Sequence, residues 1–477
     1  MNTKALRQKI LDLAIHGKLV PQDPNDEPAS VLLERIKAEK ERLIKEGKIK
    51  RSKQSKTACD KQHYENVPFE VPKGWVWCNI TNVTYKITDG THNSPINTPI
   101  GDYKYITAKN IKSSGITLNN ITYVSKYIHN EIFARCNPEK GDILYIKDGA
   151  TTGVVTINTL EEEFSLLSSV ALIKPVKNIL NKYLLYYLQS SLCYSAVRET
   201  MKGVGITRIT LKQIEKWNLP LPPFAEQSRI VAEIERWFAL IDQIEQGKYD
   251  LQASVKKAKS KILDLAIHGK LVPQDPTDEP ACELLKRINP KAEITCDNPH
   301  YRKLPFEIPS TWSWCCHNDV LEISGGSQPA KRYFSTTPKI GHVRLYQIRD
   351  YGDSPVPIYI PIEYATKQAE KGDILLARYG GSLGKVFRAE KGAYNVAMAK
   401  IVFKYKELIY KEFAYYYYLS DLYQGRLKEI SRTAQAGFNS SDFNEMYFTL
   451  PPYKEQQRIV NAINKAFTTL DAISENL

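Results

Sequence analysis

Several features that would place a chain quickly in a class are missing from this sequence. No apolar run approaches the ~18 residues that cross a bilayer, and the opening MNTKALRQKI lacks the hydrophobic stretch of a signal peptide. There is no CxxC pair and no cysteine–histidine cluster with zinc-finger spacing. We therefore expect a cytoplasmic protein without a membrane span or a bound metal. The eight cysteines are expected to be reduced and mostly buried: Cys59, Cys78, Cys136, Cys193, Cys282, Cys296, Cys315 and Cys316.

Charge of one sign is in excess. The 66 Lys and Arg residues outnumber the 53 Asp and Glu residues, which gives a net charge of +13. This balance favours a polyanionic partner, although a basic surface without a ligand is an alternative that charge alone leaves open. An apolar content of 42% with 10% aromatic residues indicates a globular protein. At 477 residues, the length indicates roughly three domain-sized parts.

The chain contains an internal duplication. The segment ILDLAIHGKLVPQDPNDEPASVLLERI at 10–36 returns at 262–288 with four differences in 27 positions. Three shorter blocks recur in the same order: HYENVPFEVPKGWVWC as HYRKLPFEIPSTWSWC, EKGDILYIKDGATTG as EKGDILLARYGGSLG, and LPPFAEQSRIV as LPPYKEQQRIV. Residues 79–138 and 318–369, by contrast, share almost nothing recognisable. One scaffold is therefore used twice and carries two variable modules.

The repeats predict the domain organisation. Apolar stretches such as GDILYI and VALIKPV predict strands, and NKYLLYYLQSSL and KEFAYYYYLSD predict helices, so the modules are expected to be α/β domains. The stretch 37–56 has nine Lys or Arg against three Glu, and is interpreted either as a phosphate-binding arm or as a solvated linker or exposed helix. The parts are an N-terminal helical segment (1–36), a charged linker (37–62), a first module (63–221), a central helical spacer (222–288), a second module (297–450) and a C-terminal helix (451–477).

A heptad pattern follows the first LPP segment. Spacings of four and three select mostly apolar residues from Ile230 to Leu265, which predicts a coiled-coil helix of about 45 residues. The prolines before its first turn and Gly269 after its last suit a helix start and a helix stop. His268 and its counterpart His16 are therefore expected to bond to the last carbonyls of their helices rather than to act as ligands or bases.

Both chain ends carry the same apolar seam. Position 477 corresponds to position 248 of the central helix and position 1 to position 253, so the two ends together rebuild all of that helix except 249–252. We therefore predict an antiparallel pair of long helices, one continuous and one divided between the termini, in a pseudo-twofold and circular arrangement. The expected helix-pair interface comprises Leu6, Ile10, Leu13, Ile230, Ile234, Trp237, Ile241, Leu251, Val255, Ile262, Ile459, Ile463, Leu470 and Ile473.

Across nearly its whole length the sequence resembles the specificity subunits of type I restriction–modification systems. The residues that carry this resemblance are the PLPPxxEQxRIV helix start, the LDLAIHGKLVPQ block, the W-x-W-C module start, the DGTHNSP segment at 89–95, and two GDIL strands followed by glycine-rich loops. The second module departs from the first, since it has SGGSQP at 324–329 where the first has DGTH.

The resemblance implies a sequence-specific reader of double-stranded DNA. It implies two target-recognition domains joined by helices that dock two modification subunits and, through them, restriction subunits. S-adenosylmethionine, ATP and Mg²⁺ are then expected in those partners and not in this chain. Because the modules differ, we expect a bipartite and asymmetric target with a fixed gap. The predicted helix would span about 68 Å, on the order of two DNA turns.

Glycine-rich loops after the GDIL strands are candidate DNA contacts, because glycine lets backbone N–H groups approach phosphates. A tight turn between strands is the alternative. These loops supply Lys147, Thr151 and Thr152 in the first module and Arg378, Tyr379, Ser382 and Lys385 in the second. A third candidate surface comprises 202–208, with Arg208, and 435–440, with Asn439.

Base reading needs side chains that can donate or accept paired hydrogen bonds at base edges. In the first module the candidates are His92, Asn93, Lys109, Asn110 and Lys112. In the second they are Gln328, Lys331, Arg332, Arg344, Gln347 and Arg349. The helical tyrosines Tyr183, Tyr186, Tyr187 and Tyr415 to Tyr418 could stack on bases, but their spacing favours a core.

The three catalytic motifs that the sequence resembles are each incomplete. LPPF and LPPY resemble an adenine methyltransferase motif, but Leu221 and Leu450 stand where that motif needs Asn or Asp. The segment from Gly380 to Val386 lacks residues that a P-loop requires. A nuclease-like set built on Asp89 and Asp102 has no counterpart in the second module. The alternatives left open are an enzyme with a divergent site and a coiled-coil scaffold that binds no DNA.

Overall fold

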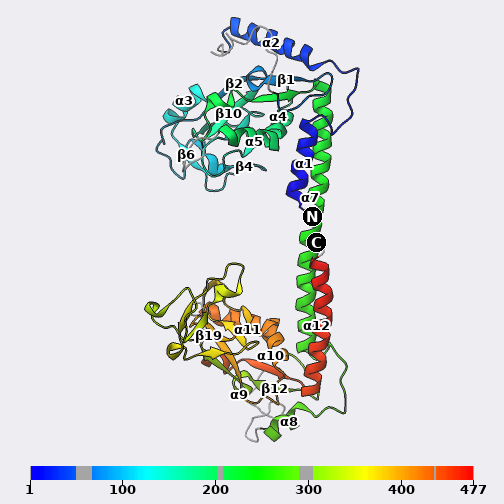
Figure 1. Cartoon of the computed structure of the whole chain (residues 1–477), viewed down its shortest axis with the longest axis vertical. Helices are drawn as coiled ribbons and strands as arrows, with labels where there is room; N and C mark the ends of the chain where they lie inside the picture. The colour runs from blue at the N-terminus through cyan, green and yellow to red at the C-terminus, as the bar shows by residue number, and fades with distance from the viewer. Residues whose placement is uncertain (1, 50–66, 201–207, 289–303, 434–436, 476–477) are drawn as a thin grey trace. The chain divides into compact units, whose positions relative to one another are not determined.

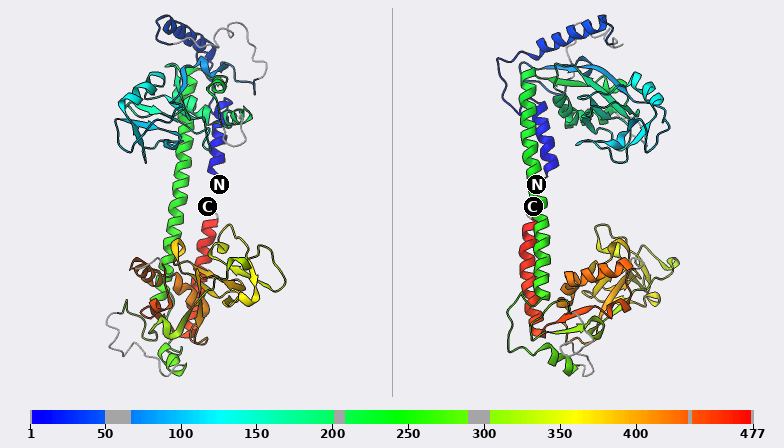
Figure 2. Two further views of the ribbon diagram at one scale, coloured as in Figure 1. Left: turned by 90° about the vertical axis from the view of Figure 1, so that its left-hand side faces the viewer. Right: turned by 180° about the vertical axis from the view of Figure 1, so that it is seen from behind.

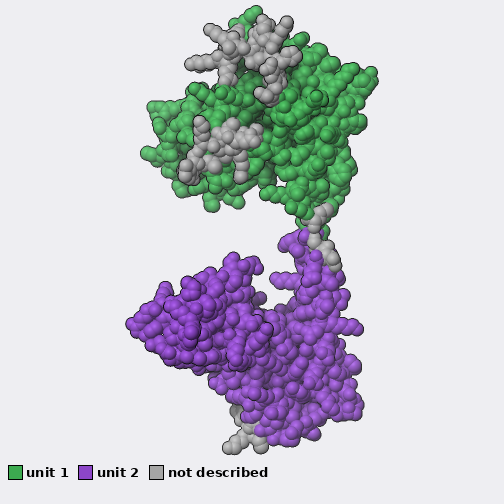
Figure 3. Space-filling view, in the orientation of Figure 1, with its two compact units in different colours: residues 1–247 green, residues 248–477 purple. Residues whose placement is uncertain are grey.

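The computed structural model describes residues 2–49, 67–200, 208–288, 304–433 and 437–475. The chain forms two compact units, residues 1–247 and 248–477 (Figure 3). Each unit contains one module of helices and sheets and one pair of packed helices (Figures 1 and 2). The predicted α/β class is confirmed, as is a long helix between the two domains.

The first unit begins with two helices, and its module follows. Its helices are α1 (Thr3–Ile15), α2 (Ala29–Lys45), α3 (Lys126–Arg135), α4 (Asn181–Gln189), α5 (Ser191–Thr200), α6 (Leu211–Ile214) and the start of α7 (Phe224–Ile267). Its strands are β1 (Val76–Asn79), β2 (Thr84–Asp89), β3 (Tyr103–Ile106), β4 (Ile111–Lys112), β5 (Gly115–Ile116), β6 (Thr122–Val124), β7 (Ile143–Ile146), β8 (Val155–Ile157), β9 (Phe164–Leu166), β10 (Val170–Pro175) and β11 (Asn218–Leu221).

The second unit repeats this order from the end of α7. Its helices are α8 (Ala281–Ile288), α9 (His317–Val320), α10 (Lys411–Leu419), α11 (Asp421–Thr433) and α12 (Tyr453–Glu475). Its strands are β12 (Ser313–Cys316), β13 (Leu321–Gly325), β14 (His342–Tyr346), β15 (Tyr359–Pro361), β16 (Gln368–Ala369), β17 (Ile374–Ala377), β18 (Val386–Arg388), β19 (Gly392–Tyr394), β20 (Met398–Phe403) and β21 (Tyr447–Leu450).

The two modules share one sheet topology. An antiparallel sheet of order β2-β10-β7-β8 in the first corresponds to β13-β20-β17-β18 in the second. A second sheet, β6-β3-β9 or β15-β14-β19-β16, contains one parallel pair in each module. The segments 79–138 and 318–369, which share almost no sequence, therefore contribute equivalent strands. In each module the strand that carries the end of the W-x-W-C block pairs with the strand that ends at the leucine of the LPP segment, Leu221 or Leu450.

Fully buried strands and aromatic side chains form the cores of the modules. The strands β7 and β17, from the two GDIL blocks, are buried along their whole length. The tyrosines of α4 and α10 are buried, as their spacing predicted, except Tyr415, which is half-buried. The hydroxyls of Tyr183 and Tyr417 donate to the carbonyls of Pro220 and Tyr447. Of the described cysteines, Cys78, Cys136, Cys193 and Cys315 are buried thiols, and none is in a disulfide.

The EQxR motif at the start of α7 forms a joint between helix and module, called here the first joint (Glu226, Gln227 and Arg229). The Glu226 carboxylate accepts from Gln22 at 3.0 Å and from the Trp75 indole at 2.9 Å. The Gln227 amide accepts from the Leu180 backbone N–H at 3.0 Å and donates to the Pro222 carbonyl at 3.1 Å. Arg229 forms an ion pair with Asp26 at 2.6 Å.

The second unit has the same arrangement in a second joint (Glu455, Gln456 and Arg458). Glu455 accepts from Gln274 at 2.7 Å, and Arg458 pairs with Asp278 at 2.6 Å. The Gln456 amide accepts from the Tyr410 N–H at 2.7 Å and donates to two carbonyls, those of Leu408 and Pro451, at 2.9 Å each. The repeated PQDP and EQxR blocks are therefore the two sides of one packing contact.

Each unit also contains an antiparallel helix pair, as predicted. Arg7 of α1 pairs with Asp242 of α7 at 2.7 Å, while Gln22, further along the chain, reaches Glu226 at an earlier position in α7. In the second unit, Lys259 of α7 pairs with Asp471 of α12. The ring of Phe238 lies under the Arg7 guanidinium, and its counterpart Phe467 lies under the Lys259 ammonium, each at 5.0 Å.

Most of the residues predicted for the seam are buried or half-buried, and three are exposed. Ile10, Ile230, Ile234, Ile241, Val255, Ile459 and Ile463 are buried, and Leu6, Leu13, Ile262 and Leu470 are half-buried. Trp237, Leu251 and Ile473 are 37%, 39% and 41% exposed. In the first unit the interface follows 230, 234, 238 and 241, because α7 packs against α4 as well as α1, so that Phe238 takes the place expected for Trp237.

The ends of α1 and α7 are built alike. The ring Nδ1 of His16 lies 2.6 Å from the Asp12 carbonyl, and that of His268 lies 2.7 Å from the Asp264 carbonyl, which confirms their predicted role as helix caps. Gly17 follows with a φ of +65°, and a Cβ there would lie 2.4 Å from Pro72. The turn therefore requires glycine.

The predicted boundary at residue 36 is not a structural one. Helix α2 runs without interruption from Ala29 to Lys45 and crosses it. The Lys40 ammonium donates to the carbonyls of Thr81 and Thr84, at 2.5 and 2.9 Å. The first part of the charged segment is thus a helix docked on the first module, and the rest, at 50–62, lies outside the described residues.

Candidate nucleic-acid interface

The glycine-rich loop of the first module starts at a buried ion pair. Asp89 ends β2, and Lys147 follows β7, on the other side of the shared neighbour β10. The Lys147 Nζ lies 3.5 Å from an oxygen of Asp89 and 3.0 Å from one of Asp148, and the side chain is only 2% exposed. A charge buried and paired in this way has no face for a phosphate, so the structure does not support the expected phosphate contact by Lys147.

Two exposed side chains, Arg135 and His92, lie beside this buried pair. Arg135, the last residue of α3, forms an ion pair with Asp89 and also donates to the carbonyls of Asp89 and Gly90, at 3.2 and 3.1 Å. His92 lies 3.3 Å from Asp89. Half of the Arg135 side chain is exposed, and that of His92 equally so. Sequence analysis missed Arg135, because it lies in the segment that has no recognisable repeat.

Two of the predicted candidate surfaces meet at this point. Asp148 and Arg208 form a β-bridge, and the Arg208 Nε lies 3.3 Å from the Asp148 carboxylate. Thr151 is exposed, whereas the Thr152 hydroxyl donates to the Gly149 carbonyl within the loop. The remaining predicted residues of this surface, 202–207, lie outside the described residues. The strand end, the glycine-rich loop and Arg208 thus form one basic corner in the first module.

The equivalent corner of the second module has different chemistry. Gly325 stands where the first module has Asp89, since it pairs with Ala399 as Asp89 pairs with Ala171. A Cβ on Gly325 would lie 2.8 Å from a guanidinium nitrogen of Arg378, the residue equivalent to Lys147. Arg378 donates to the Phe438 carbonyl at 3.3 Å, and its guanidinium lies 5.0 Å from the Tyr379 ring. Among the described residues, no carboxylate pairs with it.

The rest of this corner follows the first. Tyr379, which is exposed, forms a β-bridge with Gly437 as Asp148 does with Arg208. Ser382 is half-buried and Lys385 is exposed. Asn439 is exposed, and its side-chain oxygen accepts from the Ser441 N–H at 3.0 Å, so it caps a short turn. Positions 435 and 436 lie outside the described residues.

The predicted base readers divide into exposed and structural residues. Asn110 is buried, and its side chain bonds to the backbone of Thr107 and Thr117, so it caps a turn. The equivalent turn of the second module begins at Gln347, which is half-buried. Arg344, on the strand before this turn, pairs with Asp350 at 3.1 Å. These three residues have structural roles in this conformation. The exposed candidates are Asn93, Lys109, Lys112, Gln328, Lys331, Arg332 and Arg349.

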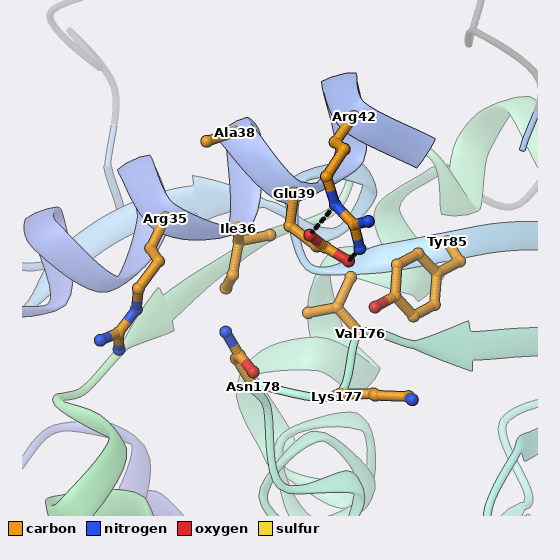
Figure 4. Close-up of a pocket in the computed structure, with 9 residues that line it drawn as sticks. All are labelled: Arg35, Ile36, Ala38, Glu39, Arg42, Tyr85, Val176, Lys177 and Asn178. Carbon is orange, nitrogen blue, oxygen red and sulfur yellow. Dashed lines mark hydrogen bonds and ion pairs between the residues drawn. The ribbon is translucent and has the colours of Figure 1, made fainter. Parts of the chain in front are cut away.

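A hollow of about 480 Å³ lies between α2 and the first module (Figure 4). Both arginines that line it are already paired, Arg42 with Glu39 at 2.6 Å and Arg35 with Glu27 at 2.7 Å. The hydrogen bond from Arg42 lowers the pKa of Glu39 below its usual range, so this carboxylate stays charged beside the opening. The hollow therefore offers no concentration of free positive charge for an anion.

Other kinds of site are not evident in the described parts of the chain. No group of three His, Cys, Asp or Glu residues there is placed to hold a metal ion. No described helix combines the length and the apolar character that crossing a membrane requires. Asp102, one of the residues considered for a nuclease site, instead accepts from the Lys126 N–H at 3.1 Å at the start of α3.

Comparison with known proteins gives consistent matches. A family model described as the type I restriction modification DNA specificity domain matches residues 72–252 and 309–477. The specificity subunit of the type I restriction enzyme EcoEI from Escherichia coli is 27% identical over 559 residues, which cover 99% of this chain and 90% of that protein. The EcoAI specificity subunit from Escherichia coli is 31% identical over 403 residues, covering 70% of this chain and 65% of that protein.

A solved structure shares the fold. It comes from work on the structural basis of complex assembly and conformational transition of the type I R-M system. Its chain superposes on this one with a TM-score of 0.62 at 17% identity, and the match covers 86% of this chain and 94% of that one.

Proposed function

Since the chain belongs to the type I restriction modification DNA specificity family, we propose that each of its modules reads one half of a bipartite, asymmetric DNA target. The observation that carries this proposal is that two modules of one sheet topology expose different side chains in their variable segments, such as Lys109 in the first and Arg332 and Arg349 in the second. Since sequence is read by hydrogen bonds at base edges, different side chains on one scaffold imply different half-sites.

Two kinds of contact serve this role. Phosphate contacts come from the basic corners and from exposed lysines of the loops, and they position each module on the duplex. Base contacts come from the exposed residues of the variable segments, such as Lys109 in the first module and Arg332 and Arg349 in the second. The Arg332 guanidinium lies 4.9 Å from the Tyr333 ring, which restricts its orientation.

The long helix sets the gap between the half-sites. At 1.5 Å per residue the 44 residues of α7 span about 66 Å. This length is on the order of two DNA turns of ~34 Å. The first joint fixes the first module to the start of α7, and the second joint fixes the second module to α12, which pairs with α7. The helix length and not the module chemistry therefore determines the gap.

The helices also dock the partners. Two modification subunits bind this chain, and restriction subunits join through them. The apolar residues Trp237, Leu240 and Ile244 on α7 are suited to a protein partner, because they are large side chains that this chain leaves 37% to 48% exposed. This chain has a non-catalytic role. S-adenosylmethionine, ATP and Mg²⁺ act in the partner subunits.

The direct test is to map methylation. The chain is co-expressed with its modification subunit in a host that lacks DNA methylation, and the modified bases are located by single-molecule sequencing. We expect a gapped, asymmetric motif that disappears when this chain is omitted. Methylation that persists without the chain, or that falls on a continuous site, contradicts the proposal.

The gap is tested separately by inserting one heptad into α7. Duplicating residues 244–250 lengthens the helix by about 10 Å, or roughly three base pairs at 3.4 Å per pair. We expect the gap to grow by that amount while both half-sites stay the same. A gap that does not change excludes α7 as the spacer.

A further inference from the structure

Arg135 is the exposed cation that the structure holds most firmly beside the glycine-rich loop of the first module. It comes from the end of α3, and no sequence motif marks it. Its Nη2 atom makes all of its hydrogen bonds, to the Asp89 carboxylate and to the carbonyls of Asp89 and Gly90. Among the described residues, its Nε and Nη1 atoms bond to nothing. One edge of the guanidinium is therefore anchored, and the N–H groups away from it are available to a ligand.

Asp89 makes this placement possible. Its carboxylate is 3% exposed and is shared by Arg135, Lys147 and His92. Lys147 is buried in the same cluster, and Asp148 pairs with both Lys147 and Arg208. Two carboxylates thus face three permanent cations, and the surplus positive charge is at the surface, on Arg135 and Arg208. A guanidinium held in place by a buried acid attracts an anion without a large cost of ordering the side chain.

The neighbours indicate which anion this is. The glycine-rich loop at 148–153 and Arg208 belong to the same charged cluster as Arg135, because Lys147 pairs with both Asp89 and Asp148, and Asp148 pairs with Arg208. Glycine-rich backbone with flanking cations is suited to a phosphate group. The second module needs no acid at this place, because Arg378 there is held by the Phe438 carbonyl.

We propose that Arg135 contacts a phosphate of the DNA backbone and that Asp89 is the positioning residue that holds it there, an inference that rests on the proposed DNA-reading function. The contact anchors the first module on the duplex and does not read bases. Removing it should weaken binding to all sequences alike.

The experiment uses the full chain in complex with its modification subunits. Fluorescence anisotropy measures the Kd for a duplex that contains the mapped target and for one that lacks it, from about 50 to 200 mM salt. For Arg135→Gln we expect a Kd roughly tenfold weaker on both duplexes. We also expect the slope of log K against log salt to be smaller by about 0.9, the loss of one phosphate contact. Arg135→Lys keeps the charge and should keep the slope.

Asp89→Asn tests the positioning role. Because Arg135 is still present, a purely structural part for Asp89 would leave the salt slope unchanged. We expect the slope to fall as in Arg135→Gln, and the double variant to lose no more than either single one. Lys177→Gln is the matched control, since it removes one exposed charge near the opposite end of β10 and should leave the slope as in the wild type.

The outcomes separate this inference from the proposed function. A wild-type complex that shows no preference for the mapped duplex contradicts the proposed function and this inference with it. A wild-type complex that prefers the duplex, with an unchanged slope in Arg135→Gln, overturns the inference alone. A lower melting temperature of Arg135→Gln with an unchanged slope would show that Arg135 only ties α3 to β2. If Asp89→Asn does not fold, the Arg135 variants alone decide.

Discussion

The equivalent corners of the two modules are built from different residues. In the first, an acid at the end of β2 holds a buried lysine and an exposed arginine. In the second, the acid is replaced by Gly325, and the space that a side chain would fill is occupied by Arg378. The exchanges at the two positions depend on each other, because without Asp89 the buried Lys147 would keep only Asp148 as a partner, and Tyr379 stands at that place in the second module. Surface chemistry is thus changed by pairs of residues and not by single ones.

A second comparison shows the reverse case, in which different residues do the same work. The backbone carbonyl at position 81 accepts from Lys40, which comes from α2. The equivalent carbonyl, at Asn318, accepts from Lys404, which follows β20 in the module itself. The same polar group is therefore satisfied by a lysine from a different place in the chain. Helix α2 is tied to the first module by a contact that the second module makes internally.

The largest expected effect concerns a feature that the modules share. A Cβ on Gly90 would lie 1.8 Å from the Leu166 carbonyl oxygen, and one on Gly326 would lie 2.1 Å from that of Asn395. Both contacts are with backbone and cannot be relieved by a side-chain rotation. Gly90→Ala and Gly326→Ala should each lower the free energy of unfolding by more than about 3 kcal/mol, measured by denaturant titration.

Gly247→Ala is the control for that pair. Gly247 is in α7 with no atom near its missing Cβ, so this change should raise the free energy of unfolding by about 0.5–1 kcal/mol. If one of the other two variants were as stable as the wild type, the two strand ends would not be equivalent.

The next effect separates the modules by pH. Burial lowers the pKa of His317 from 6.5 to about 4, whereas the equivalent residue in the first module is Ile80. Between pH 4 and 6.5 the unfolded chain binds a proton that the folded chain does not, so the free energy of unfolding rises with pH. Acidification through this window should cost the second unit about 3 kcal/mol.

His317→Ile, which introduces the residue of the first module, should remove this dependence. Denaturant unfolding at several pH values between 4 and 7 measures it, with Ile80→Val as the control that keeps the wild-type profile. An equally steep loss of stability in His317→Ile would assign the acid sensitivity to other groups.

The smallest expected difference compares the two joints. Gln456 bonds to three backbone groups and Gln227 to two. Each buried group that loses its partner costs about 1 kcal/mol or more. Gln456→Ala should therefore lower the free energy of unfolding by about 1 kcal/mol more than Gln227→Ala does. Equal losses would mean that water replaces one of the bonds to Gln456.

The sequence was sufficient to predict the elements that depend on local pattern. The apolar spacing from Ile230 predicted α7, which runs to Ile267, and the histidine and glycine after α1 and α7 predicted their caps. The error at Trp237 has a physical cause. A heptad assumes one partner helix, whereas α7 in the first unit contacts both α1 and α4, and the apolar stripe follows a period nearer 3.6 residues.

The candidate site could be predicted only in part. The glycine-rich loops and the segments that meet them were found from composition, and the structure brings them together at Asp148 and Arg208. Lys147 was predicted to contact a phosphate. Its burial could not be foreseen, because it depends on a pairing with Asp89, far away in the sequence. Arg135 was missed for the same reason. Which charges are paired depends on tertiary contacts between variable segments, and those leave no periodic signal.

The composition of the two joints bears on how such a protein can evolve. Among the described residues, the bonds of the two joints, on α7 and α12, come from the repeated blocks or from backbone groups of the module, and none comes from a side chain of 90–135 or 326–369. Mutations in the variable segments therefore accumulate without weakening the attachment. Selection can therefore change the surface of one module while the other module and the two joints stay constant. The recognition surfaces then diverge faster than the fold.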